Sequence, residues 1–252
     1  MKINIYNKSN PYGNFNLIEK DLISTHIYHH DVWEPHLLYF YSQMIKPHHN
    51  IIDCGANIGF HTVQFGKLIK QGIVYSFEPQ PVLFNILNLN ILSNNLTLKI
   101  RPISLAVSNT NKLFKMSSIE EQIFNKDIVN YGGRRLIDEG NGEIVNSITL
   151  DNIFKDSNIN IYLIKLDIQG HELEAIDGAK FLIHSCHPVF FIENYITEIK
   201  DQQVLSTLIN YGYKIYRIEA MNNEDCIALH PNYHSEEINL VNNQTEYKII
   251  AI

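Results

Sequence analysis

Residues Asp53–Thr62, with the sequence DCGANIGFHT, constrain the fold more than any other part of the chain. The apolar pair Ile51-Ile52 precedes them, as at the end of a buried strand, and an amphipathic stretch over 63–69 follows, as in a helix. Gly55 and Gly59 permit a close approach of the backbone to a ligand. The start of a helix also offers unpaired N–H groups to an anionic ligand group. This strand–turn–helix unit therefore predicts a site for a nucleoside-bearing cofactor.

Apolar strand patterns alternate with helical patterns along most of the chain. The alternation predicts an α/β fold with a doubly wound, mostly parallel sheet. Ligands of such sheets bind at the carboxyl ends of the strands, near the point where the strand order reverses. We expect helices at about 35–44, 60–70, 82–92, 172–183 and 202–211, and strands at about 50–54, 73–78, 96–102, 162–167, 189–193, 213–218 and 247–252. Four acids end predicted strands and are expected along one edge of the sheet: Asp53, Glu78, Asp167 and Glu193.

We interpret residues 1–252 as a single domain. Residues 1–32 are polar, with many aromatic residues and histidines, and we expect them to form a loosely structured lead-in. The region 109–150 breaks the alternation of strands and helices and is interpreted as an insertion. Residues 219–246 carry no pattern that assigns them a role.

The composition excludes several classes of protein. Hydrophobic residues make up 45% of the chain, which supplies a sizeable core. The formal charge is −7 and no run of lysine and arginine occurs, so nucleic acid is not the expected partner. Three scattered cysteines indicate neither a disulfide framework nor a zinc site. Without a signal peptide or a transmembrane stretch, we expect a cytoplasmic protein.

The turn distinguishes between possible cofactors. Asn57 stands where a dinucleotide-binding fingerprint has its second glycine, which argues against a pyrophosphate ligand. S-adenosylmethionine has no phosphates, and the turn can receive its methionyl part, with Asp53 near its positive charges. Glu78 ends the second strand, where a carboxylate can accept hydrogen bonds from both ribose hydroxyls. The alternative is that Gly55 and Gly59 merely tighten a loop and that Glu78 caps the next helix.

The same motifs resemble those of the FkbM family of methyltransferases. The resemblance covers about residues 33–195 and rests on segments 33–35, 53–62, 77–79, 149–151, 164–172 and 191–193. It implies a class I, Rossmann-like methyltransferase that uses S-adenosylmethionine and usually methylates an oxygen of a sugar or another small hydroxylated molecule. Gln169 departs from the pattern, which usually has an acid there. Ser104 and Ala106 lie where this fold usually contacts the adenine.

An alcohol acceptor gains from a general base, because its proton must leave. Asp167 ends the fourth strand, and His171 and Glu172 follow across Gly170. We expect Asp167 and His171 on the acceptor side of the site, with Glu172 orienting it. Alternatively, His171 is an exposed residue at a helix start, and Glu172 favours the positive helix N-terminus. Lys165 lies within an apolar strand and is expected to have a structural role.

Two further clusters are candidate sites. Arg134 and Arg135 follow two glycines in the insertion, where they can clamp a carboxylate or phosphate of the acceptor or form a solvated turn. His26 and His30 have helical i, i+4 spacing, but a metal site needs a third ligand, so we expect no metal.

Three rival functions remain at this stage. The first is a nucleotide-dependent oxidoreductase with the same kind of sheet, which Asn57 disfavours. The second is methylation of nucleic-acid bases, which the sequence after the fourth strand, Asp167-Ile168-Gln169-Gly170, does not support. The third is a non-catalytic binding module that retains the fold.

Overall fold

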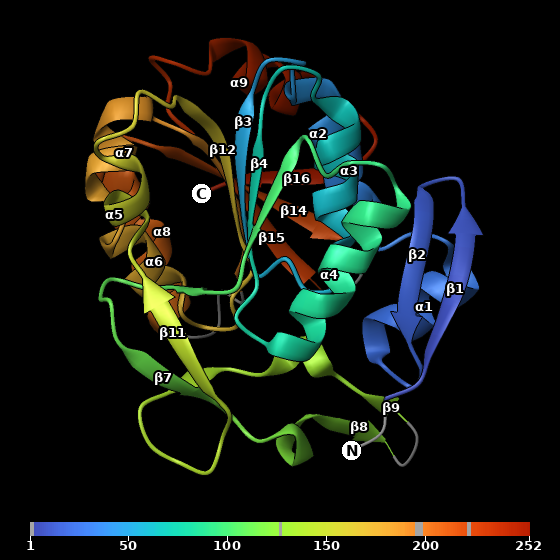
Figure 1. Ribbon diagram of the computed structural model, residues 1–252. Coiled ribbons are helices and arrows are strands. Elements are labelled where there is room, and N and C mark those ends of the chain that lie inside the picture. Colours follow the sequence, from blue (N-terminus) through green and yellow to red (C-terminus); the bar gives the residue numbers. More distant parts are fainter. Residues whose placement is uncertain (1–2, 126–127, 195–198, 221–222) are drawn as a thin grey trace.

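An eight-stranded sheet forms the centre of the computed structural model, which describes residues 3–125, 128–194, 199–220 and 223–252 (Figure 1). The strands lie in the order β16-β14-β15-β13-β12-β3-β4-β5. In chain order they are β3 (Asn50–Cys54), β4 (Val74–Phe77), β5 (Ile100–Ile103), β12 (Ile161–Leu166), β13 (Val189–Glu193), β14 (Lys214–Ala220), β15 (Asn223–Leu229) and β16 (Lys248–Ala251). The five strands from β13 to β5 are parallel, as expected.

The sheet is nevertheless mixed, because β15, β14 and β16 extend it with antiparallel pairings. The strand expected at 247–252 is confirmed as β16. Strand β15 and helix α9 (Ser235–Asn243) were not expected, since residues 219–246 show no clear periodicity. The strand expected at 96–102 begins only at Ile100, because Leu96 closes the end of the preceding helix by donating its N–H to Ile91.

Side chains alternate between the two faces of the buried strands. Ile51, Leu163 and Phe191 pack on one face, where α2 (Pro35–Met44), α3 (Phe60–Leu68), α4 (Pro81–Ser93) and α9 lie. Ile52, Ile164 and Phe190 pack on the other face, where α5 (Leu150–Phe154), α6 (Glu172–Asp177), α7 (Lys180–Cys186) and α8 (Ile199–Asn210) lie. Figure 1 shows these two helical layers on either side of the sheet. The core is thus continuous on both faces, as expected for a doubly wound sheet.

The helix expected at 172–183 is two helices, α6 and α7. Gly178 lies at the break, where a Cβ atom would stand 2.1 Å from the carbonyl oxygen of Ser108. The close contact between these backbones bends the chain, and a single straight helix does not fit there.

The expectation of a loosely structured lead-in is wrong. Residues 5–30 form a hairpin of β1 (Ile5–Asn10) and β2 (Gly13–Ile18), followed by helix α1 (Leu22–His30). Phe15, Leu17 and Ile18 are buried in the core. Their burial was hidden because polar residues on the outer face of the hairpin dominate its composition. The side chain of Asn90 in α4 accepts the backbone N–H of Asn16 at 2.6 Å and joins the hairpin to the sheet layer.

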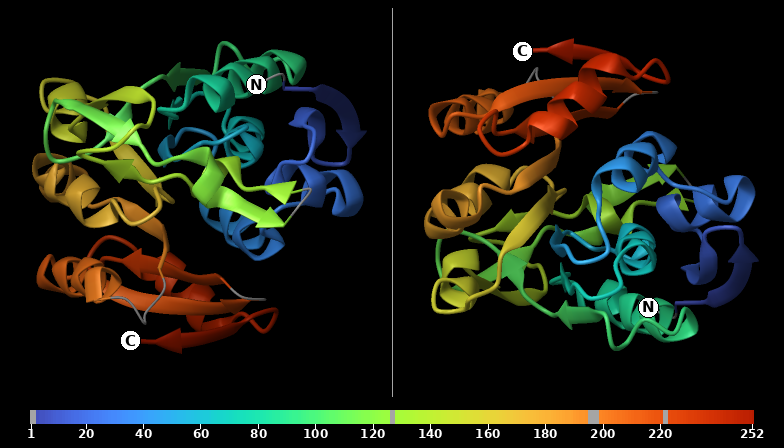
Figure 2. Two further views of the ribbon diagram at one scale, coloured as in Figure 1. Left: turned by 90° about the horizontal axis from the view of Figure 1, so that it is seen from below. Right: turned by 90° about the horizontal axis from the view of Figure 1, so that it is seen from above.

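The insertion forms a second, smaller sheet in the order β10-β7-β11-β6. The insertion contributes strands β7 (Leu113–Met116), β10 (Leu136–Ile137) and β11 (Ile144–Ile148), and β6 (Ala106–Val107), which precedes it, pairs with β11. The short elements within the insertion are η1 (Ile119–Gln122), β8 (Ile123–Asn125), β9 (Ile128–Val129) and η2 (Tyr131–Gly133). Seen from below in Figure 2, the insertion crosses the carboxyl edge of the main sheet toward the lead-in. There the N–H of Val129 donates to the carbonyl of Lys20 at 2.9 Å. Within the described residues, no helix has the length and apolar character needed to cross a membrane.

Candidate active site

The site lies where the strand order reverses, between β3 and β12. From β3 the chain continues to β4 and β5 on one side of this point, and from β12 it continues to β13 on the other side. Gly55 follows β3 with φ +80°, and a Cβ atom there would stand 1.8 Å from the carbonyl oxygen of Asp167, which follows β12. Only glycine fits this position, because any side chain would collide with the backbone that follows β12.

Glu78 directly follows β4 and is only 3% exposed. Its carboxylate accepts the N–H of Asn57 at 2.9 Å and the N–H of Gln80 at 2.8 Å. Burial raises the pKa of Glu78 to about 7, although these two hydrogen bonds oppose the shift. The carboxylate faces a pocket and can accept hydrogen bonds from a ligand there.

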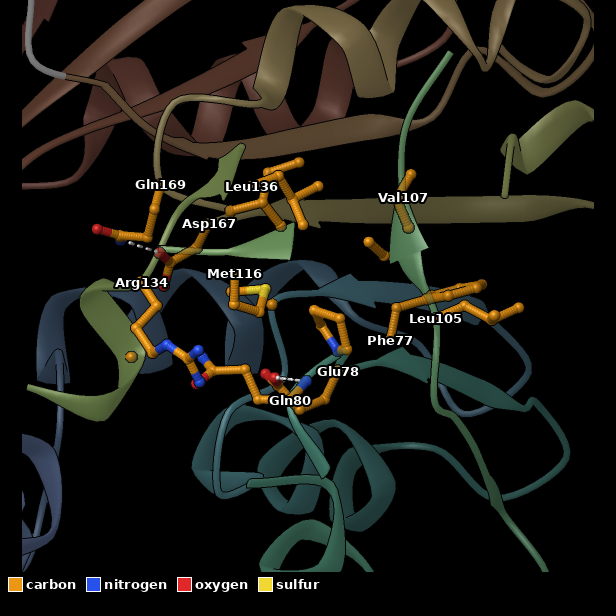
Figure 3. Close-up of a pocket in the computed structure, with 15 residues that line it drawn as sticks. Phe77, Glu78, Gln80, Leu105, Val107, Met116, Arg134, Leu136, Asp167 and Gln169 are labelled. Carbon is orange, nitrogen blue, oxygen red and sulfur yellow. Dashed lines mark hydrogen bonds between the residues drawn. The ribbon is translucent and has the colours of Figure 1, made fainter. Parts of the chain in front are cut away.

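A first pocket of about 440 Å³, partly open to solvent, extends from Gly55 past Glu78. In Figure 3, Arg134 and Gln80 lie together on one side, while Phe77 and Leu105 lie on another. The apolar lining suits a flat heteroaromatic ring, and comes from Phe77, Leu105, Ala106, Val107, Met116 and Leu136. Ala106 is thus placed in this pocket, whereas Ser104 is exposed and does not line it.

A second cavity adjoins the first and measures about 680 Å³, partly open to solvent. The two share five lining residues, Gly55, Glu78, Gly132, Asp167 and Gln169. The second cavity also has Leu22, Ile23, Trp33, Glu34, Asn57, Asn130 and Glu193 in its wall. Acids, amides and one indole dominate this wall, so it differs in chemistry from the apolar first pocket.

Asp167 lies at the junction of the two cavities. Its carboxylate accepts Nζ of Lys165 at 2.8 Å and the side-chain amide of Gln169 at 3.1 Å. Burial disfavours ionisation, but the charge and hydrogen bond of Lys165 hold the pKa of Asp167 below its ordinary value. Burial opposes the charged form of Lys165, but the negative charge of Asp167 raises the pKa of this lysine above its ordinary value. Gln169 also donates to Glu193 at 2.8 Å and fixes both acids at the cavity wall.

Asp53, Asn57 and Gly59 shape the turn itself. Asp53 is fully buried behind it, where one carboxylate oxygen accepts the hydroxyl of Thr62 at 2.5 Å. Its other oxygen has no hydrogen-bond partner among the described residues. Asn57 has φ +54° and lines the second cavity, while Gly59 has φ +88° and caps α3 outside both cavities. Of these three, only Asn57 faces the space for a ligand.

His171 and Glu172 do not line either cavity. The Nε2 atom of His171 lies 2.9 Å from the hydroxyl of Ser108, and its ring packs edge-on against Phe114. The Glu172 carboxylate accepts the N–H of Ile168 at 2.9 Å. The structure therefore places Asp167 in the site and separates it from both neighbours, because the left-handed residues Gln169 and Gly170 turn the chain away.

The two arginines of the insertion also differ. Arg134 lines the first pocket, donates Nε to the carbonyl of Ser117 at 2.7 Å and donates NH1 to Gln80 at 3.1 Å. Arg135 is exposed and outside both cavities. The structure therefore places no arginine from this pair in the wall of the second cavity.

Sequence reasoning missed the residues that the lead-in, the start of α2 and the insertion contribute to the wall of the second cavity. Trp33 and Glu34 were assigned only to the start of a helix, yet both line the second cavity. Gly132 packs against Asn57, so that a Cβ atom there would stand 2.3 Å from its amide nitrogen. The signal available for Glu34 was its place before Pro35, at the N-cap of a predicted helix. Among the described residues, no group of three or more histidine, cysteine or acidic side chains is arranged to hold a metal ion.

The residues present fit S-adenosylmethionine. Gly55 lines both cavities, where the amino-acid end of such a ligand fits beside its backbone. Glu78 offers a carboxylate for ribose hydroxyls, and the apolar first pocket suits adenine. The orphan oxygen of Asp53 and the carboxylate of Asp167 offset positive charge near the turn.

Comparisons with known proteins agree with this fit. Residues 53–215 match the model of the methyltransferase FkbM domain. Methyltransferase sdnD of Sordaria araneosa is 24% identical over 153 residues, which cover 51% of this chain and 59% of that protein. The crystal structure of methyltransferase FkbM from Methylobacillus flagellatus superposes with a TM-score of 0.54 at 21% identity, covering 80% of this chain and 49% of that one. A putative O-methyltransferase from Klebsiella pneumoniae gives 0.50 at 8% identity, covering 80% and 82%.

The two solved structures share the fold with this chain, and the family match spans well over half of its residues. That match also decides against the nucleotide-dependent oxidoreductase. The chain belongs to the FkbM family of methyltransferases, and its cofactor is S-adenosylmethionine.

Proposed function

We propose that this methyltransferase acts on a hydroxyl oxygen of a small hydroxylated molecule, such as a sugar or a glycoconjugate. The observation that supports this proposal is the second cavity, which adjoins the cofactor pocket and shares Asp167 with it. Its wall holds carboxylates and amides that accept hydrogen bonds from hydroxyl groups, and the flat indole of Trp33 suits the apolar face of a sugar ring.

The charge of the wall bears on the choice of acceptor. Among the described residues, the wall of the second cavity holds Glu34, Glu78, Asp167 and Glu193 and no arginine or lysine. A phosphate or carboxylate beside these acids would be repelled. We therefore propose a neutral acceptor, and we do not assign Arg134 and Arg135 to an acceptor clamp. The same acidic lining and the net charge of −7 argue against a nucleic-acid acceptor.

The division of labour follows from the geometry. The cofactor supplies a methyl carbon already activated by its sulfonium. Gly55 and Glu78 hold the cofactor at the switch point, and the apolar side chains of the first pocket exclude water from it. Asp167, pinned by Lys165, stands between the cofactor and the acceptor and aligns the two. We assign the turn over 53–62 to cofactor binding, and the lead-in and insertion to the recognition of the acceptor.

The test is methyl transfer from radiolabelled S-adenosylmethionine to a panel of glycerol, myo-inositol, methyl glycosides and primary amines. Label in the hydroxyl compounds, with the new O-methyl group located by NMR, supports the proposal. Label in the amines alone would assign nitrogen methylation instead. Binding of S-adenosylhomocysteine without transfer to any compound in the panel would count for a non-catalytic binding module.

A further inference from the structure

Glu34 has an unusual conformation for a residue at the start of a helix. It is the N-cap of α2 with φ +47° and ψ +61°, a left-handed conformation that residues with a Cβ atom rarely adopt. An acidic N-cap normally accepts a hydrogen bond from the first turn of its own helix, but the Glu34 side chain makes no such bond. Its backbone instead directs the side chain toward the second cavity, whose wall it lines.

The side chain is held there by a histidine from another element. The Oε2 atom of Glu34 lies 2.9 Å from Nε2 of His61, and the two side chains are only 7% and 8% exposed. His61 is in the first turn of α3, directly after the glycine turn that receives the cofactor. The pair therefore joins the acceptor wall to the cofactor loop across 27 residues of sequence.

The other carboxylates of the cavity are committed to different partners. Both oxygens of Asp167 accept hydrogen bonds, from Lys165 and Gln169, and Asp167 also lines the cofactor pocket. Glu78 is fixed by two backbone N–H groups on the nucleoside side. Glu193 accepts the side-chain amide of Gln169 at 2.8 Å, which ties it to Asp167. Glu34 lines the second cavity but not the first, so its carboxylate lies on the acceptor side of the junction.

Among the described residues, the ionisable groups that act on Glu34 include His61 of α3, Tyr41 of α2, Lys165 and Asp167 at the end of β12, and Asp225 of β15. Burial alone would raise the pKa of Glu34. The hydrogen bond and charge of His61, with the charge of Lys165, instead bring that pKa below its ordinary value. Glu34 is therefore ionised at neutral pH.

We propose that Glu34 is the catalytic residue that receives the proton of the acceptor hydroxyl, and that His61 is the positioning residue that holds it. This inference rests on the proposed hydroxyl methylation. As the acceptor oxygen forms its bond to the methyl carbon and the carbon–sulfur bond breaks, the hydroxyl proton moves to the Glu34 carboxylate. The cofactor leaves as the neutral thioether, and the proton on Glu34 later passes to solvent, so atoms and charge balance.

The experiment uses the full chain and the best hydroxyl acceptor from the panel described above. Glu34→Gln is expected to lower kcat roughly 100- to 10,000-fold, the usual contribution of a general base, while S-adenosylhomocysteine binding stays within about threefold of wild type. Glu34→Ala is expected to regain at least about tenfold in turnover when formate is added as an external base.

Asp225→Asn is the matched control, because Asp225 forms a second buried carboxylate–histidine pair, with His36 of α2, at 2.6 Å. This pair lies outside both cavities. This variant should keep kcat and respond to no formate. His61→Leu should move the acid limb of the kcat/KM profile to higher pH, because Glu34 loses its donor, and His61→Gln should return the limb toward wild type.

Three outcomes overturn the inference. Full turnover by Glu34→Gln would remove the base role. A loss of S-adenosylhomocysteine binding in parallel with kcat, without rescue by formate, would make Glu34 a structural residue. If the wild-type enzyme itself methylates no hydroxyl compound, the proposed function fails and this inference fails with it, whereas active wild type with active Glu34→Gln refutes only the role of Glu34.

Discussion

The buried carboxylate of Glu78 makes a sharp prediction about stability. Burial raises its pKa to about 7 from the 4.5 of an exposed glutamate, so the folded protein binds this proton more tightly than the unfolded chain does. The stability that protonation contributes is therefore fully present below pH 4.5 and is lost as the pH rises through about 7. Above about pH 7, the ligand-free protein therefore carries a buried negative charge on Glu78 that lowers its stability.

The size of the effect follows from the two pKa values. Between pH 8.5 and pH 5.5, proton uptake by Glu78 should stabilise the ligand-free wild type by about 2 kcal/mol. Glu78→Gln cannot take up this proton. We therefore subtract the free energy of unfolding of wild type from that of the variant at each pH. This difference should be about 2 kcal/mol larger at pH 8.5 than at pH 5.5. At either pH the variant also loses one of the two backbone hydrogen bonds, which subtracts a constant.

Urea denaturation of both proteins at pH 5.5, 7 and 8.5 measures this difference. Glu19→Gln is the matched control for the same substitution at an exposed position. Calorimetric titration with S-adenosylhomocysteine should show weaker binding to Glu78→Gln at every pH. A difference between Glu78→Gln and wild type that is independent of pH would refute the reasoning, since it would mean that Glu78 ionises like an exposed acid.

Three further predictions concern the remaining site residues. Gly55→Ala should weaken S-adenosylhomocysteine binding at least about tenfold, since its Cβ overlaps the Asp167 carbonyl. Gly170→Ala should bind nearly normally, because Gly170 has a similar φ of +87° but open space around it. Equal losses of binding in the two variants would contradict the role of the Gly55 contact. Lys165→Met should lower the free energy of unfolding by about 1–3 kcal/mol at pH 7, because it leaves the half-buried Asp167 without its cation. A loss below about 1 kcal/mol in urea denaturation would argue against the ion pair. His171→Ala should keep kcat within about threefold of wild type and lose roughly 1 kcal/mol of stability with the Ser108 contact, while a hundredfold loss of turnover would restore the base role first expected for His171.

The sequence predicted the parallel half of the fold well, because its strands are buried on both faces and its helices begin with clear signals. Pro35 and Pro81 stand at the first positions of α2 and α4, as expected. The lead-in was misjudged for the opposite reason, since a hairpin with one polar face hides its buried residues among asparagines and tyrosines. The break between α6 and α7 depends on a contact with Ser108, some 70 residues away, and no local pattern reports such a contact.

The cofactor side of the site was likewise more accessible to prediction than the acceptor side. Gly55 and Glu78 follow strand ends within one continuous stretch, so their order in the sequence reflects their arrangement in space. His171 was misplaced because two left-handed residues, Gln169 and Gly170, reverse the chain just before it. Glu34 was overlooked as a wall residue because the meeting of α2 with the second cavity depends on the whole packing of the lead-in against the insertion.

The mixed character of the sheet separates two tasks. No described residue after Glu193 lines either cavity, although β14 and β15 bury Ile215, Ile218 and Cys226 in the core. The antiparallel strands thus act as a buttress that holds β13 in place from outside. The cavities and the outer antiparallel strands therefore occupy different parts of one sheet, and we expect volume-conserving substitutions in β14 and β16 to change stability and not the choice of acceptor.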